Sequence, residues 1–186
     1  MKPEKPPKAI SPKVAILFLM VLFAGCEEFP DHQPRAVFIS HHINYAWGYQ
    51  DRGFVIDAEG NVRSFNMPES WNYHDSQGYI TVADMEQNLA QLEEPHCKVS
   101  KYDLLFYGTK LEKALKGKIT EPEHQMCDAG STTVAGYIYE SATNRYRYVF
   151  LRQTGDFYRE NTSREAGDIY EWMLDPCSGS PSVRLR

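Results

Sequence analysis

The stretch Thr132-Thr-Val-Ala-Gly-Tyr-Ile-Tyr-Glu140, followed by Tyr146-Arg-Tyr-Val-Phe-Leu-Arg-Gln153, decides the fold class. Both segments are rich in β-branched and aromatic residues, and the polar segment Ala142-Thr-Asn-Arg145 lies between them. Such runs favour strands, and a short polar interruption favours a tight turn. We therefore predict a β-hairpin over residues 132–153.

Nearer the N-terminus, a second set of segments has the same character. Residues 36–47 are β-branched and aromatic, which predicts a strand. Gly53-Phe-Val-Ile-Asp57 and Asn61-Val-Arg-Ser-Phe65 flank Ala58-Glu-Gly60, a turn signal of the hairpin kind. The sequence thus predicts two hairpin units.

Three helices are predicted from N-cap residues that precede apolar residues on one face. Thr81 lies three residues before Asp84, Ser100 lies three residues before Asp103, and Ser163 precedes the last apolar stripe. The stripes are Val82, Met85, Leu89 and Leu92, then Leu104, Leu105, Leu111, Ala114 and Leu115, then Ala166, Ile169, Trp172 and Met173. The order ββ-αα-ββ-α predicts an α+β fold with about three helices and a mostly antiparallel sheet.

The N-terminal residues carry a different pattern. Four lysines and one glutamate are followed by ten uncharged apolar residues, Val14 to Phe23, and then by Ala24-Gly25-Cys26. A membrane-spanning helix needs about 20 residues. The shorter run is typical of the core of a signal peptide. A buried helix or an uncleaved anchor is the alternative interpretation of this run.

This arrangement resembles the signal peptides of bacterial lipoproteins, in which a lipobox of the form Leu-x-Gly/Ala-Cys is diacylated on its cysteine and cut before it. Phe23-Ala-Gly-Cys26 matches three of the four positions, with Phe23 where Leu is commonest. The resemblance implies a signal peptide over residues 1–25, lipidation of Cys26 and a location in the bacterial cell envelope, periplasmic or surface-exposed. Two acyl chains suffice for stable membrane anchoring.

After the leader, the chain has the length of one domain. We expect residues 26–35 to form a tether and residues 36–186 to form a single α+β domain. Removing the four lysines and one glutamate of the leader from the 20 basic and 25 acidic residues leaves 16 against 24, a net charge of −8. Nucleic acid is therefore not an expected partner, because phosphate binding needs clustered Lys and Arg.

The remaining cysteines are Cys97, Cys127 and Cys177. An exported protein meets a non-reducing compartment, so one disulfide is expected. We predict that Cys97 pairs with Cys127, which would tie the start of the second helix to the loop before the last hairpin. Cys177 would then be the free thiol.

Two histidines beside these cysteines offer an alternative. His96 and His124 complete a set of two His and two Cys, the ligand set of a structural zinc site. Adjacent residues such as His96 and Cys97 rarely bind one tetrahedral ion, so we favour the disulfide. A zinc site and unpaired structural thiols stay open as alternatives, and no cofactor is expected.

His41 and His42 are the next candidates for chemistry. Neighbouring side chains of a strand point to opposite faces, so we expect one of the two to be packed and the other solvated. Four acids, in contrast, could supply a carboxylate pair of the kind that glycosidases use. Ordinary helix-start and solvated positions are the simpler interpretation of these acids. They are Asp156, Glu160, Asp168 and Glu171.

Four tyrosines of the last predicted hairpin share strand faces. Tyr137 and Tyr139 lie on one face of the first strand, and Tyr146 and Tyr148 lie on one face of the second. If these faces coincide and are open, they form an aromatic strip that could stack on sugars or bind a protein. A place in the core is the alternative.

The sequence lacks the usual signatures of nucleotide binding and of common hydrolases. We therefore expect a lipid-anchored, non-enzymatic binding or interaction domain. Its partners would be the membrane, through the lipid, and an envelope protein or a glycan. The alternative is a small envelope hydrolase that uses His41 or His42 with carboxylates.

Overall fold

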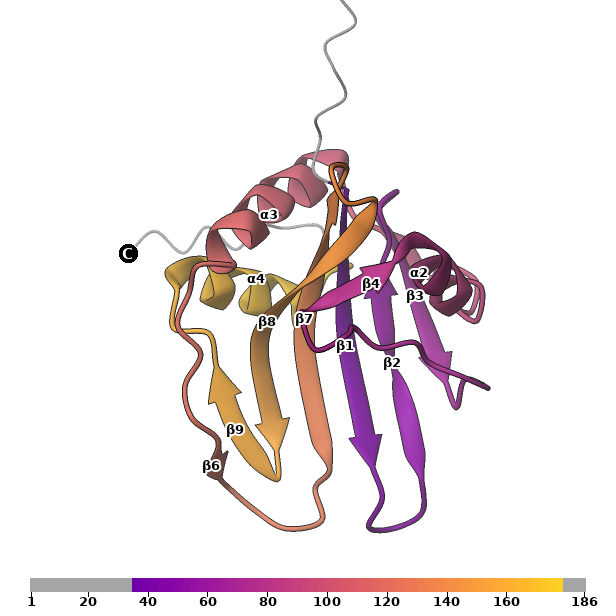
Figure 1. Ribbon diagram of the computed structural model, residues 1–186. Coiled ribbons are helices and arrows are strands. Elements are labelled where there is room, and N and C mark those ends of the chain that lie inside the picture. The colour runs from indigo at the N-terminus through magenta and orange to yellow at the C-terminus, as the bar shows by residue number, and fades with distance from the viewer. Residues whose placement is uncertain (1–34, 179–186) are drawn as a thin grey trace, which may run out of the picture. The chain divides into compact units, whose positions relative to one another are not determined.

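The computed structural model describes residues 35–178 (Figure 1). The predicted signal peptide, Cys26 and the tether up to residue 34 lie outside the described residues. Within them, none of the helices is long and apolar enough to cross a membrane.

The described residues form an α+β fold with one open, antiparallel sheet. The helices and the long strands follow one another in the order that the apolar patterns predict, and four short strands, β4, β5, β6 and β9, are added. The strands are β1 Ala36–Asn44, β2 Gln50–Ile56, β3 Asn61–Asn66, β4 Tyr79–Thr81, β5 Cys97–Lys98, β6 Glu123–His124, β7 Ser131–Glu140, β8 Arg145–Gly155 and β9 Phe157–Glu160. The helices are α2 Val82–Leu89, α3 Lys101–Ala114 and α4 Arg164–Met173.

Both predicted hairpins are confirmed, as β2–β3 and β7–β8. The strand order is β5-β3-β2-β1-β7-β8-β9-β6, and β4 pairs with β8. Strand β1 joins the two hairpin units because it pairs antiparallel with β2 on one side and with β7 on the other. The predicted α+β class with an antiparallel sheet is therefore confirmed.

The first strand is shorter than predicted. It ends at Asn44, and the chain turns back through Tyr45–Tyr49 into β2, so β1 and β2 also form a hairpin. Gly48 has a φ of 96°, a left-handed conformation that favours glycine. The aromatic residues of this segment therefore lie in a turn, where β propensity does not decide the conformation.

The three predicted helix starts are confirmed. The side chain of Thr81 accepts a hydrogen bond from the Asp84 N–H, and Ser100 accepts one from Asp103. Ser163 caps α4 in the same way. Each cap satisfies a backbone N–H that has no partner within its helix, which is why these residues fix the helix starts.

The sheet is covered on both faces. Helices α3 and α4 pack on one face, where Phe38 meets Trp172 edge-to-face with ring centroids 5.1 Å apart. We call this the α3–α4 face. The other is the α2 face, covered by α2 and by residues 67–78, which cross in front of the sheet in Figure 1. Side chains alternate between the two faces along β1, so this strand contributes to both cores. Phe38 points to the α3–α4 face, and Val37 and Ile39 point to the α2 face.

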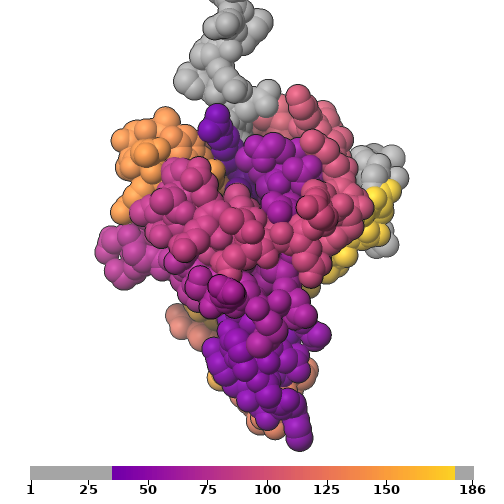
Figure 2. Space-filling view, turned by 90° about the vertical axis from the view of Figure 1, so that its right-hand side faces the viewer, coloured from indigo at the N-terminus to yellow at the C-terminus, as the bar shows by residue number. Residues whose placement is uncertain are grey.

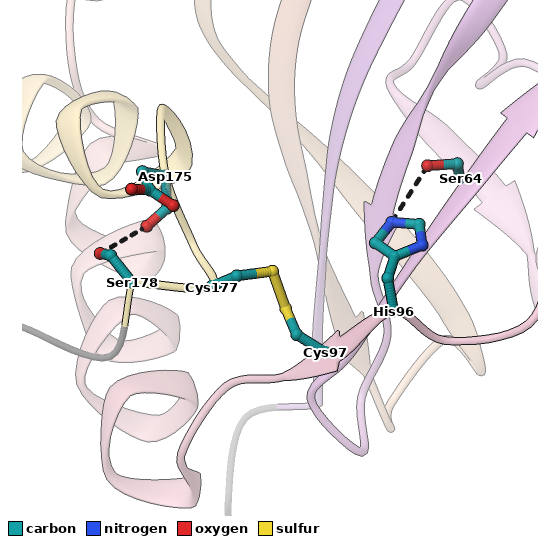
Figure 3. Close-up of a disulfide and its surroundings, with 6 residues drawn as sticks. All are labelled: Ser64, His96, Cys97, Asp175, Cys177 and Ser178. Atoms are coloured by element: carbon teal, nitrogen blue, oxygen red, sulfur yellow. Dashed lines mark hydrogen bonds between the residues drawn. A yellow bond between two sulfur atoms is a disulfide. The ribbon is translucent and has the colours of Figure 1, made fainter.

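The predicted disulfide between Cys97 and Cys127 is wrong. Cys97 pairs with Cys177 instead, with Cα atoms 5.9 Å apart (Figure 3). Cys127 is the free, exposed thiol. Cys97 lies in β5, and Cys127 follows β6. These two strands are the opposite edges of the sheet, roughly 30 Å apart at the usual strand spacing. A disulfide needs Cα atoms within about 7 Å.

The observed disulfide connects edge strand β5 to the segment just after α4 (Figure 3). The two cysteines are 80 residues apart in sequence. A closed loop of this length stabilises the fold by roughly 4.5 kcal/mol in the loop-entropy model. It links the two ends of the chain segment 97–177, which contains both helices of the α3–α4 face.

Candidate functional site

A cavity of about 170 Å³ lies on the α2 face, between β1 and β7 of the sheet and the connection from β3 to β4. Its walls consist of four aromatic and three aliphatic side chains, Ser131 and Thr133, and two histidines. The lining residues are Ile39, His41, Ile43, Trp71, Tyr73, His74, Ser131, Thr133, Ala135, Tyr137 and Tyr148. Neither Lys, Arg, Asp nor Glu is among these lining residues.

The connection that covers the cavity is held by α2. The Asn88 side chain is buried and accepts a hydrogen bond from the Asn72 N–H at 2.8 Å. Its Nδ2 donates to the Asn72 carbonyl oxygen, also at 2.8 Å. These two bonds fix the backbone between Trp71 and Tyr73, and so position both rings over the sheet.

His41 lies at the sheet side of the cavity and is buried. Its Nε2 donates a hydrogen bond to Asp51 Oδ1 at 2.6 Å, since a carboxylate can only accept. Asp51 is buried on β2 and accepts a second hydrogen bond, 2.8 Å long, from the Tyr49 hydroxyl to Oδ2. This bond to Asp51 is the main reason that the pKa of Tyr49 rises to about 12. Nδ1 of His41 is left for another partner.

Three aromatic rings surround His41. The ring centroid of Phe65 lies 5.2 Å from that of His41, and the centroid of Trp71 lies 5.4 Å from it. Tyr73 is almost parallel to the imidazole at 6.0 Å. Burial raises the pKa of Tyr73, and the nearby charges of Asp51 and Tyr45 raise it further. The imidazole is thus held by one hydrogen bond and packed among ring faces.

The opposite wall contains Tyr137 and Tyr148, whose ring centroids are 5.3 Å apart. His74 stands over Tyr148 at 4.0 Å. Burial raises the pKa of Tyr148 to about 12, and also raises the pKa of Tyr137. Both phenols are therefore neutral at physiological pH, and the wall is uncharged.

The four tyrosines of the predicted strip do share one face. Tyr137 pairs with Tyr148, and Tyr139 pairs with Tyr146, across the β7–β8 ladder. The strip is not open, because Tyr137 is only 6% exposed and belongs to the core of the α2 face. Tyr137 and Tyr148 line the cavity, whereas Tyr139 and Tyr146 lie further along the hairpin and do not.

His42 points to the α3–α4 face, so the prediction that the two histidines point to opposite faces is confirmed. His41 is packed as expected, whereas His42 is less solvated than predicted. His42 is half-buried, and its Nδ1 lies 2.9 Å from Thr132 Oγ1. It lines a separate, open groove with Arg52. The pKa of His42 is lowered by burial and then by the positive charge of Arg52 and by His41.

The four acids predicted as a carboxylate pair do not reach either hollow. Asp156 accepts a hydrogen bond from the Ala129 N–H at 2.8 Å. Glu160 binds Arg152 at 3.2 Å, and Asp168 forms an ion pair with Lys110. Glu171 is exposed. The first three acids therefore make contacts within the fold, and the fourth is solvated.

The predicted zinc ligands are also dispersed. His96 lies 3.1 Å from the Ser64 hydroxyl at one edge of the sheet (Figure 3). His124 belongs to β6 at the other edge and lies near Cys127, with Nε2 and Sγ 3.7 Å apart. Cys97 is in the disulfide. Within residues 35–178, no three potential ligand residues are grouped closely enough to hold a metal ion.

Asp51, Tyr49, Trp71 and Tyr73 are the site residues that sequence reasoning missed. Asp51 meets His41 only through the β1–β2 register, in which His41 lies opposite Gly53 and Asp51 is the next residue on the same face. The cluster Trp71-Asn-Tyr-His74 within a polar connection was the available signal, because aromatic residues in loops often have a binding role.

The arrangement suits a small, uncharged ligand. Ring faces offer stacking, Thr133 and Ser131 offer hydroxyl groups, and His41 offers a ring nitrogen. The volume is below the roughly 300–1,000 Å³ of pockets for drug-sized ligands. One ring or one side chain therefore fits. Comparisons with protein-family models, curated proteins and solved structures found no match to this chain.

Proposed function

We propose that this protein is a lipid-anchored, non-enzymatic binding protein of the bacterial cell envelope, and that the cavity around His41 is its binding site. The observation that carries the proposal is the buried hydrogen bond between His41 and Asp51 in an aromatic cavity. The ligand belongs to an envelope partner, either a glycan or a protein side chain.

The anchoring part of the proposal rests on the leader. Cys26 follows an apolar run of signal-peptide length, and only a short segment separates it from β1 at Ala36. Diacylation of Cys26 would hold the domain at the membrane surface.

A labelling experiment tests the anchor. In bacteria that produce the full chain, Cys26→Ser should abolish the incorporation of labelled palmitate and release the protein from the membrane fraction. Cys127→Ser is the matched control, because Cys127 is an exposed free thiol and its loss should change neither result. Continued labelling and membrane retention of the Cys26→Ser protein would reject lipidation.

The binding part of the proposal follows from the free-energy cost of burying the hydrogen-bonded pair His41 and Asp51. Replacing a buried charged pair by apolar residues is often neutral or stabilising, so such a pair is weak evidence for a role in stability. His41 and Asp51 are 7% and 3% exposed. Their presence beside a cavity without Asp, Glu, Lys or Arg in its lining therefore favours a role in ligand recognition.

Site-specific photocrosslinking tests the binding site without assuming the ligand. A photoreactive residue replaces Tyr73 at the cavity in one variant, and Tyr102 on α3 in another. Both tyrosines are exposed, so neither change should affect folding. Adducts in cells are expected at position 73 and should disappear when Trp71→Ala is added. Equal adducts at both positions, or none at 73, would reject the cavity as the site.

A small hydrolase is the second candidate. Tyr49, Asp51 and His41 form a hydrogen-bonded series that orients the imidazole, as a general base requires. The structure brings one carboxylate to His41, and the other acids lie elsewhere. If the protein is an enzyme, ligand should be converted at a rate that His41→Gln abolishes while binding persists. Unchanged ligand mass after incubation would exclude turnover.

A further inference from the structure

The turn between β1 and β2 carries three exposed aromatic side chains, which we call the aromatic tip. They are Tyr45, Trp47 and Tyr49, which are 75%, 79% and 48% exposed. Single exposed aromatic residues are ordinary, whereas a cluster of them marks an interaction surface. In Figure 2 the indigo and purple residues of this hairpin form a narrow projection at the lower end. The tip therefore offers ring faces to solvent at the end of the sheet.

The aromatic tip continues the face that holds the cavity. His41 and Ile43 line the cavity from β1, and the turn that follows β1 brings Tyr45 against Tyr49. On the returning strand, Tyr49 precedes Asp51 by two residues and donates its hydroxyl hydrogen to that carboxylate. The ring centroids of Tyr45 and Tyr49 are 5.2 Å apart.

Asp51 links the cavity to the tip. One of its oxygens accepts from His41 in the cavity, and the other accepts from Tyr49 in the tip. Tyr73 stacks parallel to His41, and its pKa is raised by burial and then by Asp51 and Tyr45. We use the word row for the rings of Trp71 and Tyr73 beside His41 together with those of Tyr45 and Tyr49 beside Asp51.

We propose that the cavity and the aromatic tip together bind one neutral glycan chain, with one sugar in the cavity and the following sugars stacked on the tip. This inference rests on the proposed function, because it takes the cavity as a ligand site. A sugar ring has an apolar C–H face and a hydroxyl edge. The row offers ring faces, and the cavity adds the hydroxyls of Ser131 and Thr133.

Charge and shape favour this ligand over others. Since the cavity lining contains neither acidic nor basic side chains other than histidine, it offers no partner to an anionic polymer. A stable protein partner typically buries about 800 Å² on each side. A narrow row of rings suits a linear chain better than such a flat contact. The chain would run toward the turn after Asn44, the end of β1 far from Ala36, where the proposed tether joins.

The test is a length series of oligosaccharides. The full chain with Cys26→Ser is titrated calorimetrically with N-acetylglucosamine oligomers of one to six units as neutral probes. The dissociation constant should fall about tenfold between the single sugar and the tetramer, the factor that about 1.4 kcal/mol of added stacking gives. Trp47→Ala should remove this gain and leave single-sugar binding unchanged. Trp71→Ala should weaken the binding of every oligomer.

Tyr102→Ala is the matched control, because Tyr102 is an equally exposed aromatic residue on the other face of the sheet. It should bind like the parent protein. Trp71-dependent binding of a single sugar without a gain in longer oligomers would overturn the role of the tip and leave the cavity as a binding site. Absent saccharide binding together with a protein adduct at position 73 would reject the glycan. The loss of both signals would reject the proposed function as well.

Discussion

The two faces of the sheet are built from the same strands and differ in what covers them. On the α3–α4 face, two helices of fourteen and ten residues pack aliphatic and aromatic side chains closely against β1, β7 and β8. The α2 face is covered by an eight-residue helix and by the connection over residues 67–78. A helix presents a continuous apolar stripe, whereas an irregular connection does not.

The consequence is a cavity on the α2 face, whereas the hollow beside His42 on the α3–α4 face is an open groove. Gly136 lets Leu111 of α3 rest directly on β7, because a side chain at this position would meet the leucine. Across the sheet, Trp71 and Tyr73 touch His41 but leave a hollow between them and β7. Under the proposed function, stability and binding lie on opposite faces of one sheet, and four experiments test that division.

The largest effect is expected on the α3–α4 face. Phe38 is fully buried and packs against Trp172, so Phe38→Ala should cost about 3–5 kcal/mol of unfolding free energy through lost burial and a new cavity. Urea denaturation followed by circular dichroism measures the change. Tyr102→Ala serves as the control and should cost little, since Tyr102 is 70% exposed. A cost below about 1 kcal/mol for Phe38→Ala would contradict the assignment of the main core to this face.

The disulfide comes next, because it ties β5 to the end of α4. The double variant Cys97→Ser and Cys177→Ser should lose about 2–4.5 kcal/mol, at most the value of the loop-entropy model, and the loss should match that of the reduced parent protein. Thermal unfolding with and without a reductant measures this. Cys127→Ser should behave like the parent protein, as Cys127 is free. A peptide map that links Cys97 to Cys127 would refute the observed pairing.

A smaller effect is expected for the polar pair on the α2 face. Asp51→Leu leaves the buried His41 without its partner and should cost about 1.5–3 kcal/mol. Adding His41→Leu removes both polar groups, so the double variant should recover much of that stability while the ligand is no longer bound. Chemical denaturation of both single variants and of the double variant measures the coupling. A double variant less stable than either single one would show that the pair serves stability.

The smallest effect concerns pH. Burial raises the pKa of Tyr148 to about 12 in the folded protein, against about 10 in an unfolded chain. The folded state therefore favours the neutral phenol, and this contribution is fully present below pH 10 and is lost as pH rises toward 12. As pH rises from 10 to 12, we expect the free energy of unfolding of Tyr148→Phe to fall by about 1 kcal/mol less than that of the parent protein.

Ultraviolet absorption measures the ionisation of the tyrosine, and denaturation at several pH values measures the free energy of unfolding. Tyr102→Phe is the control, since the side chain of Tyr102 is 70% exposed. A phenol of Tyr148 that ionises near pH 10 would contradict its burial in the cavity wall.

Local patterns predicted the parts of the fold that depend on nearby residues. The hairpins β2–β3 and β7–β8 follow from alternation around short turns, and the caps at Thr81, Ser100 and Ser163 follow from a backbone N–H three residues away. The same reasoning predicted that His41 and His42 face opposite sides of the sheet. Each of these features depends on residues that are close together in the sequence.

Long-range pairings were beyond the same reasoning. Cys97 and Cys177 are 80 residues apart, and the positions of the cysteines relative to the predicted elements favoured the wrong partner, Cys127. Sequence patterns did not show that β5 and β6 would be opposite edges of one sheet. The two strands become opposite edges because β1 pairs with both hairpin units and joins them in one sheet.

The sequence by itself determined the α+β class, the helix starts and the leader pattern that predicts an anchor at Cys26, because these depend on neighbouring residues and on their periodicity. Only the tertiary structure decided the disulfide partner and the cavity. The cavity joins His41 and Asp51 from one hairpin, Trp71 and Tyr73 from a connection, and Tyr148 from the other hairpin. Such a meeting depends on strand order and register, which are set by the packing of the whole chain.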